Sequence, residues 1–268
     1  MKIRNSIKKS VIFIGLQMAD GSYRFVGTGL FFFDHTQLER HTYLGTAKHV
    51  IEGIKSTGLD TVYIRVNLKN RLSQWFNTSI DKWIYADDPN VDIAIHSCGI
   101  LDDWDHEFFS LGLAMTEKVI QEHEIEVGEE VFVVGLFKHH HGTSKNIPIV
   151  RVGNISALPE EKIQTKEYLM DAYLIEARSI GGLSGSPVFV NLGTIRIIKE
   201  KIVHRTKELH FIMGLITGHY DSKTKEIDSA DNKENERVNT GIAIVTPVDK
   251  LIELFNSDKI IEFEKTLK

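Results

Sequence analysis

Short apolar and aromatic runs, each followed by a turn signal, recur along this chain and restrict it to an all-β fold. In the first hundred residues we expect strands at 11–16, 23–33, 41–45, 61–66, 75–85 and 91–95. In the second half we expect strands at 131–136, 147–156, 168–177, 187–190, 194–198, 209–217 and 241–245. Short strands with regular turns are typical of closed β-lobes. We therefore predict a closed first lobe and an all-β second half.

Residues 101–118 interrupt this pattern and mark the expected connection between the lobes. The first lobe would then span residues 1–100 and the second 119–246. Four carboxylates surround Trp104 in the connection: Asp102, Asp103, Asp105 and Glu107. The cluster lacks the glycine and the distal glutamate of a loop-type calcium site. We expect a solvated linker.

The second half ends in a predicted helix over residues 247–268. Thr246 is the expected N-cap and Pro247 the expected first residue. Ahead of it, residues 221–237 are almost wholly charged and polar, which predicts a surface loop. The three histidines at 139–141 alternate sides on any strand, so we expect a solvated loop rather than a metal site there.

Composition excludes some function classes. The chain has 268 residues and a net charge of −5, whereas nucleic-acid-binding domains are usually basic. Its single cysteine, Cys98, cannot form an intrachain disulfide, and we expect it to be a small buried apolar residue. The apolar run at 11–16 is too short for a signal peptide or a membrane span. We predict a cytoplasmic protein without nucleic-acid or membrane partners.

A serine stands in a glycine-lined run at 180–190, before a proline and a strand-like apolar run. We call residues 182–187 the serine turn. On a tight turn, Ser184 can expose its hydroxyl beside backbone N–H groups that point at the same place. Acyl transfer needs this pairing of a nucleophile with oxyanion donors. Glycine and serine also dominate ordinary turns, so the serine turn alone does not establish a catalyst.

Two local sequences upstream supply the partners that a nucleophilic serine needs. Residues 46–50 read Thr-Ala-Lys-His-Val and contain His49, and residues 91–95 read Val-Asp-Ile-Ala-Ile and contain Asp92. An imidazole removes the hydroxyl proton, and a carboxylate fixes the tautomer of that imidazole. Each residue also has a commoner structural role: a turn serine, a half-exposed helix histidine and a strand-end cap. Their joint occurrence in matching contexts favours the catalytic interpretation.

These motifs resemble those of the trypsin-like (chymotrypsin-fold) serine peptidases. Within that group they are similar to the disulfide-free bacterial type of the high-temperature-requirement proteases, without a recognisable PDZ domain. Further matching runs are Gly-Thr-Gly-Leu at 27–30, Gly-Asn-Ile-Ser-Ala at 153–157 and Thr-Gly-Ile-Ala-Ile-Val-Thr-Pro at 240–247. The resemblance covers most of the chain. It implies two packed six-stranded antiparallel β-barrels with a C-terminal helix.

Carried over residue by residue, the resemblance implies that Ser184 is the nucleophile and His49 the general base, then acid. Asp92 would orient His49. The backbone N–H groups of Gly182 and Ser184 would form the oxyanion hole. The implied activity is that of a serine endopeptidase acting on peptides or proteins through an acyl-enzyme, without a metal or a cofactor.

The chain departs from the family pattern around the serine turn. Ser186 replaces a glycine often seen after the nucleophile, and we interpret it as structural. Lys48 stands beside the histidine and is expected to point to solvent. Residues 178–181 lack the Asn-Pro-Gly-Asn character of the high-temperature-requirement group. An activating protein partner is therefore a candidate for ordering the oxyanion loop.

Substrate preference rests on two positions relative to Ser184. Arg178 would lie near the floor of the primary specificity pocket and His219 on its wall. Together they would favour an acidic or polar side chain through charge-assisted hydrogen bonds. The alternative is that Arg178 pairs with a surface carboxylate.

The same sequence features are compatible with two other functions. The chain could be a peptidase-like binding or scaffold module whose oxyanion loop is collapsed. It could also be an esterase that uses the same three residues.

Overall fold

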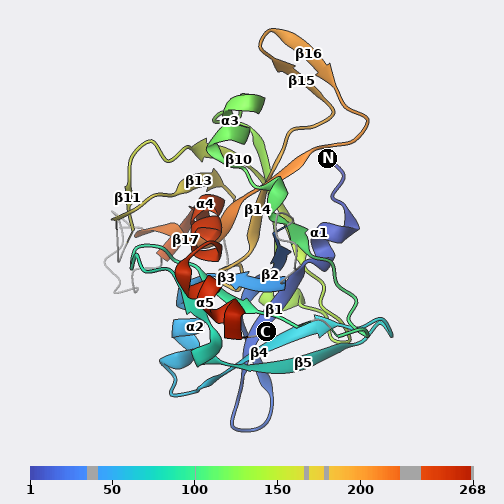
Figure 1. The fold of residues 1–268 in the computed structure, drawn as a ribbon, viewed down its shortest axis with the longest axis vertical. Coiled ribbons are helices and arrows are strands. Elements are labelled where there is room, and N and C mark those ends of the chain that lie inside the picture. Colours follow the sequence, from blue (N-terminus) through green and yellow to red (C-terminus); the bar gives the residue numbers. More distant parts are fainter. Residues whose placement is uncertain (35–41, 100, 166–168, 178–180, 224–236, 267–268) are drawn as a thin grey trace, which may run out of the picture.

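Strands account for most of this structure, a computed structural model that describes residues 1–34, 42–99, 101–165, 169–177, 181–223 and 237–266. Two lobes lie one above the other in Figure 1. The sheet of strands β1 to β8 forms one lobe, and the strands from β9 onward form the other.

The first lobe is an eight-stranded sheet with the order β5-β4-β1-β2-β3-β7-β6, and β8 pairs with β2 off this path. Its strands are β1 (Val11–Gln17), β2 (Tyr23–Phe33), β3 (Thr42–Thr46), β4 (Thr61–Asn67), β5 (Ser73–Ser79), β6 (Ile84–Tyr85), β7 (Ala94–Ser97) and β8 (Phe109–Ser110). All pairs are antiparallel except β2 with β8. The lobe thus has more strands than the expected six, and its strand order is open.

The second lobe contains a closed barrel with the strand order β10-β13-β18-β17-β14-β9. Its strands are β9 (Glu130–Gly135), β10 (Ile149–Ala157), β13 (Tyr173–Glu176), β14 (Pro187–Asn191), β17 (His210–Lys223) and β18 (Arg237–Pro247). Two hairpins stand apart from the barrel: β11 (Ile163–Gln164) with β12 (Leu169–Met170), and β15 (Ile195–Ile198) with β16 (Lys201–His204). The β15–β16 hairpin projects from the end of this lobe (Figure 1).

Helices are short and cover the sheets. They are α1 (Asn5–Lys9), α2 (Lys48–Lys55), α3 (Glu117–His123), α4 (Val248–Phe255) and α5 (Asp258–Thr266), with 3-10 turns η1 (Ile80–Lys82), η2 (Leu111–Leu113) and η3 (Lys138–His140). The C-terminal segment is two helices rather than one. Pro247 is still the last residue of β18, and Thr246 does not cap α4 because its hydroxyl bonds to the hydroxyl of Thr217.

Two predicted strands are broken in the structure. Residues 75–85 form β5, then η1, then β6, because Ile80 and Trp83 turn inward and are buried. The Trp83 indole N–H donates to the Thr78 hydroxyl at 2.9 Å across this turn. Residues 169–177 are likewise divided between β12 and β13.

The connection at 101–118 is ordered around a buried tryptophan, although Asp102, Asp103 and Glu107 are exposed as expected. Trp104 is buried, and its ring lies 5.0 Å from the ring of Phe76 and 5.8 Å from that of Phe31. Asp105 forms an ion pair with Lys9 of α1. Among the residues that the structure describes, no group of three or more histidine, cysteine or acidic side chains could hold a metal ion. Of the four carboxylates around Trp104, Asp105 is the one in a described ion pair.

One hydrophobic cluster lies between the lobes and includes helix α4. It combines Phe32 and Tyr43 of the first lobe with Phe132 and Phe189 of the barrel. Phe255 of α4 is fully buried in it, with ring centroids 5.1 Å from Tyr43 and 6.1 Å from Phe32. The C-terminal helix therefore helps to hold the lobes together.

Replacing Phe255 with alanine should destabilise the fold by about 3–5 kcal/mol, because a large ring leaves the inter-lobe cluster. Urea unfolding followed by tryptophan fluorescence measures this change. The matched control is Ile261→Ala on α5, where 44% of the side chain is exposed and the loss should be small. Equal losses in the two variants would show that α4 does not anchor the lobes.

Burial lowers the pKa of His96 on β7 to about 4, from an ordinary value of 6.5. Between these values the unfolded chain binds a proton at this position and the folded chain does not. The free energy of unfolding should therefore fall as the pH drops from about 6.5 towards 4, by roughly 2 kcal/mol at pH 5 from this residue. Urea unfolding at pH 7 and pH 5 measures it. His96→Phe should lose less stability than wild type over this interval, and identical losses would contradict the assignment.

Candidate active site

His49 and Asp92 are brought together in the first lobe. His49 is the second residue of α2, and Asp92 lies two residues before β7. One carboxylate oxygen of Asp92 lies 2.7 Å from His49 Nδ1, and the other accepts the His49 backbone N–H at 2.8 Å. Asp92 is 2% exposed, whereas the His49 side chain is 38% exposed. The buried carboxylate thus holds the ring with Nδ1 protonated, which leaves Nε2 as the basic atom.

The backbone bond from His49 to Asp92 follows from the position of the histidine at the start of a helix. The first N–H groups of a helix have no partner within it, and a carboxylate is favourable at this positive end. Asp92 supplies that partner from a distant part of the chain. The same interaction fixes the helix start and the imidazole.

The serine turn is a tight turn at the start of β14. Gly182 and Gly185 have φ values of 105° and 80°, which side chains other than glycine rarely adopt. The Gly185 N–H donates to Ile216 O at 2.8 Å, and Ile216 N–H donates back to Ser186 O at 2.9 Å. The turn is therefore fastened to β17 at Gly185 and at Ser186.

Thr28 of β2 ties the serine turn to the first lobe. Its backbone N–H donates to Ser184 O at 2.9 Å, and its hydroxyl donates to Gly182 O at 2.8 Å. The same hydroxyl accepts the Leu136 N–H at 3.0 Å. Thr28 O accepts a hydrogen bond of 2.7 Å from the hydroxyl of Thr46, which stands two residues before α2. Thr28, itself fully buried, thus links the segments that carry His49 and Ser184.

Two glycines allow the lobes to approach this closely. A Cβ on Gly185 would lie 2.2 Å from Thr46 Oγ1 and 2.3 Å from Thr28 O. A Cβ on Gly27 would meet the Val50 side chain at 2.7 Å and Ser184 O at 3.2 Å. The serine turn consequently packs directly against the residues beside His49.

The two expected oxyanion donors lie on the serine turn. In the part of the chain that the structure describes, neither the Gly182 N–H nor the Ser184 N–H is used in a hydrogen bond. The carbonyl of Gly182 is held by Thr28, and Leu136 and Lys138 pack against Gly182. Over the same residues, no hydrogen bond joins the Ser184 hydroxyl to His49.

The structure also places Ser186, Lys48 and Cys98, which the sequence had drawn attention to. Ser186 is fully buried against Gly135, and its hydroxyl has no partner among the described residues. Lys48 is only 20% exposed and lies 3.6 Å from Glu52 along α2. Burial raises the pKa of the Cys98 thiol to about 12, which makes it a poor nucleophile.

The structure describes one of the two expected specificity residues. His219 is half-buried on β17, three residues beyond the Ile216 that fastens the serine turn. Arg178 lies outside the described residues, as do Ser179 and Ile180. Gly181 is described, and it faces the Lys138 side chain.

The closed barrel, the β-sheet lobe packed on it and the C-terminal helix are those of the trypsin-like fold, so the fold prediction is confirmed. A solved structure with a similar fold is the apo MamO protease domain from Magnetospirillum magneticum. Its TM-score is 0.56 at 11% identity, over 95% of this chain and 100% of that one. Human heparin binding protein is also similar, with a TM-score of 0.41 and 16% identity over 79% and 89%.

At 11% identity the likeness to the MamO protease domain shows the fold alone. No protein-family model matches the chain, and no curated protein matches it. No helix among the described residues is long and apolar enough to span a membrane.

The role of Thr28 was not visible in the sequence, although its Gly-Thr-Gly run stood out as a motif. Replacing Thr28 with valine should destabilise the protein by about 2–4 kcal/mol, because Gly182 O and Leu136 N–H lose a buried partner. Thr28→Ser keeps the hydroxyl and loses one methyl group, so it should cost about 1 kcal/mol. Urea unfolding compares the two. Equal losses would mean that the hydroxyl does not hold the serine turn.

Proposed function

We propose that this protein is a serine endopeptidase that uses Ser184, His49 and Asp92. The observation that supports this most is the double contact of buried Asp92 with the ring and backbone of His49, beside a serine turn fastened to the same lobe. A histidine fixed in this way has one basic nitrogen, which is what activation of a serine hydroxyl requires.

The proposed reaction begins when His49 Nε2 takes the proton of the Ser184 hydroxyl as Oγ attacks the scissile carbonyl. The carbonyl oxygen becomes an oxyanion, and the N–H groups of Gly182 and Ser184 stabilise it. His49 then donates its proton to the leaving amine, which leaves an acyl-enzyme at Ser184. Water deprotonated by His49 hydrolyses the ester and restores the serine. Asp92 stabilises the imidazolium in both halves of the reaction.

Productive geometry requires Ser184 Oγ to come within hydrogen-bond reach of His49 Nε2. Such bonds are often formed only in the substrate complex, so their absence at rest is compatible with catalysis. The second candidate function is a catalytically silent binding or scaffold module on the same fold. An activating protein partner is part of the first proposal, because the serine turn lies between Thr28 and the Leu136–Lys138 segment and can be influenced from both.

We also propose a family type, a substrate preference and a cellular location. The motifs at 27–30, 46–50 and 240–247 support a type similar to the high-temperature-requirement proteases. Arg178 and His219 are proposed to favour acidic or polar side chains before the scissile bond. The single buried cysteine supports a location in the cytoplasm.

A fluorophosphonate probe with a reporter group tests the nucleophile directly. Wild-type protein should be labelled covalently, and Ser184→Ala should not, since the probe reacts only with an activated hydroxyl. Asp92→Asn should lower peptide turnover by about 10⁴, because the amide cannot hold the reactive tautomer of His49. Intact-mass spectrometry follows the labelling, and a quenched peptide library follows the turnover.

Ser186→Ala is the matched control, because it removes a neighbouring hydroxyl that is fully buried. It should retain the labelling of wild type. Labelling that persists in Ser184→Ala would place the nucleophile elsewhere. No labelling of wild type, even after addition of cell lysate, would favour the silent module. Turnover of esters without turnover of peptides would favour the esterase.

A further inference from the structure

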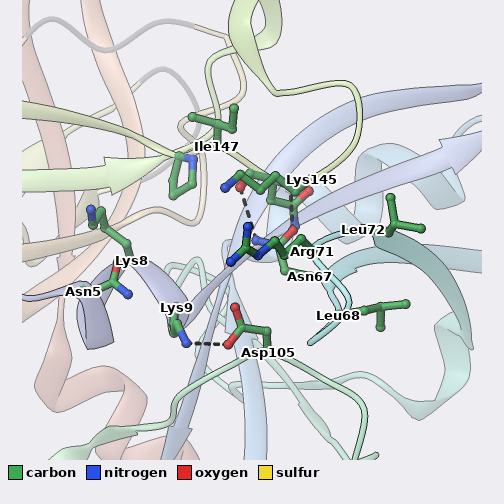
Figure 2. A pocket seen from close by; sticks show the side chains of 12 residues that line it. Asn5, Lys8, Lys9, Asn67, Leu68, Arg71, Leu72, Asp105, Lys145 and Ile147 are labelled. Atoms are coloured by element: carbon green, nitrogen blue, oxygen red, sulfur yellow. Dashed lines mark hydrogen bonds and ion pairs between the residues drawn. The ribbon is translucent and has the colours of Figure 1, made fainter.

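A basic pocket lies where helix α1, the β4–β5 turn and the segment 145–148 meet, a region that the proposed catalysis does not use. Its volume is about 270 Å³. Figure 2 shows Lys8 and Lys9 of α1 on one side of the pocket, Leu68 and Leu72 on the other, and Arg71 and Lys145 between them. The pocket is bounded by residues of both lobes.

The charges that line this pocket do not cancel. Lys8, Lys9, Arg71 and Lys145 contribute four cations, and Asp105 is the one carboxylate among the described residues that line the pocket. Asp105 is already paired with Lys9. Among the described residues, no ion pair engages Lys8, Arg71 or Lys145. Three cations thus converge on one pocket of a chain whose net charge is −5.

The walls of the pocket are held in place by hydrogen bonds. Arg71 has a φ of 68°, and its turn is closed by Leu68 N–H to Leu72 O at 2.8 Å and Arg71 N–H to Leu68 O at 3.0 Å. Opposite it, Asn146 N–H donates to Asn67 Oδ1 at 2.6 Å, and Asn67 Nδ2 donates to Asn146 O at 3.2 Å. The cationic groups therefore stand on pre-formed backbone, which lowers the entropic cost of binding.

Asn146 anchors the 145–148 segment and keeps one buried acceptor without a partner among the described residues. Its side chain is 4% exposed and lines the pocket. The amide nitrogen donates to Arg65 O at 2.5 Å, but the amide oxygen has no hydrogen-bond partner within the described residues. A buried acceptor without a partner costs about 1–3 kcal/mol.

The rim of the pocket is apolar on two sides. Leu72 is 52% exposed and Ile147 is 37% exposed, and both line the pocket. None of the described residues that line it is aromatic, so these residues offer no surface on which nucleic-acid bases would stack. An acidic peptide combines carboxylates for the cations with aliphatic side chains for the rim.

We propose that the pocket formed by α1, the β4–β5 turn and residues 145–148 binds an acidic segment of a partner protein. Its carboxylates meet Lys8, Arg71 and Lys145, and an aliphatic side chain covers Leu72 and Ile147. Because Arg71 belongs to the first lobe and Lys145 precedes β10 of the second, the bound segment spans the two lobes. This site is independent of catalysis at Ser184.

Fluorescence polarisation of a labelled peptide of alternating glutamate and leucine tests the proposal, with the full chain carrying Ser184→Ala to exclude cleavage. We expect saturable binding that weakens with salt. Joint Arg71→Glu and Lys145→Glu substitutions should reduce the affinity at least about tenfold, since two attractive contacts become repulsive. Lys201→Glu on the distant β16 is the matched control and should leave binding unchanged. A peptide of alternating lysine and leucine should not bind.

Unchanged affinity in the doubly substituted protein would overturn the proposal, as would equal loss in Lys201→Glu. Displacement of the peptide by an oligonucleotide or pyrophosphate that binds more tightly would reassign the site to a different anion. Thermal unfolding checks that the double variant is folded, and Lys145→Glu alone, at an exposed position, serves as a second test with a smaller loss. None of these readouts depends on activity at Ser184.

Discussion

The arrangement of the candidate site depends on one buried threonine. Thr28 satisfies the carbonyls of Gly182 and Ser184 and the N–H of Leu136, and it accepts a hydrogen bond from Thr46. Two lobes that meet only through apolar side chains could slide, because hydrophobic contact is non-directional. Directional bonds from one residue to both segments remove that freedom. The serine turn is therefore placed relative to the His49 helix by the backbone of the opposite lobe.

A second constraint on the arrangement of the lobes is hydrophobic burial between them. The cluster between the lobes joins Phe32 and Tyr43 to Phe132 and Phe189, and helix α4 adds Phe255 from the end of the chain. This burial supplies the non-directional attraction, while Thr28 and the loop that carries Asn146 supply the register. The acidic-peptide pocket lies on that same loop. The two proposed sites thus share the lobe boundary but use different side chains.

Local patterns in the sequence predicted much of the fold. The aromatic run at 23–33 is β2 residue for residue, and the predicted strand at 187–190 lies within β14. The misses occurred where a distant contact decides the conformation. Residues 75–85 break because Trp83 turns into the core, and the acidic connection is ordered because Trp104 packs on Phe31 and Phe76. The order of residue types within a segment does not show which of its side chains will be buried against another segment.

In the candidate site, too, local sequence predicted some features and contacts between distant segments decided the others. By itself, the sequence determined that Ser184 stands on a glycine-rich turn and that His49 and Asp92 stand in contexts that suit a base and its carboxylate, because turn formers, strand formers and motif residues act locally. Only the tertiary structure decided that Asp92 holds His49 at two points and that the Thr28 hydroxyl reaches residues 108 and 154 positions away. It also decided which lysines and arginines share a pocket. Hydrogen bonds and charge pairs of that separation exist only once the two lobes have packed.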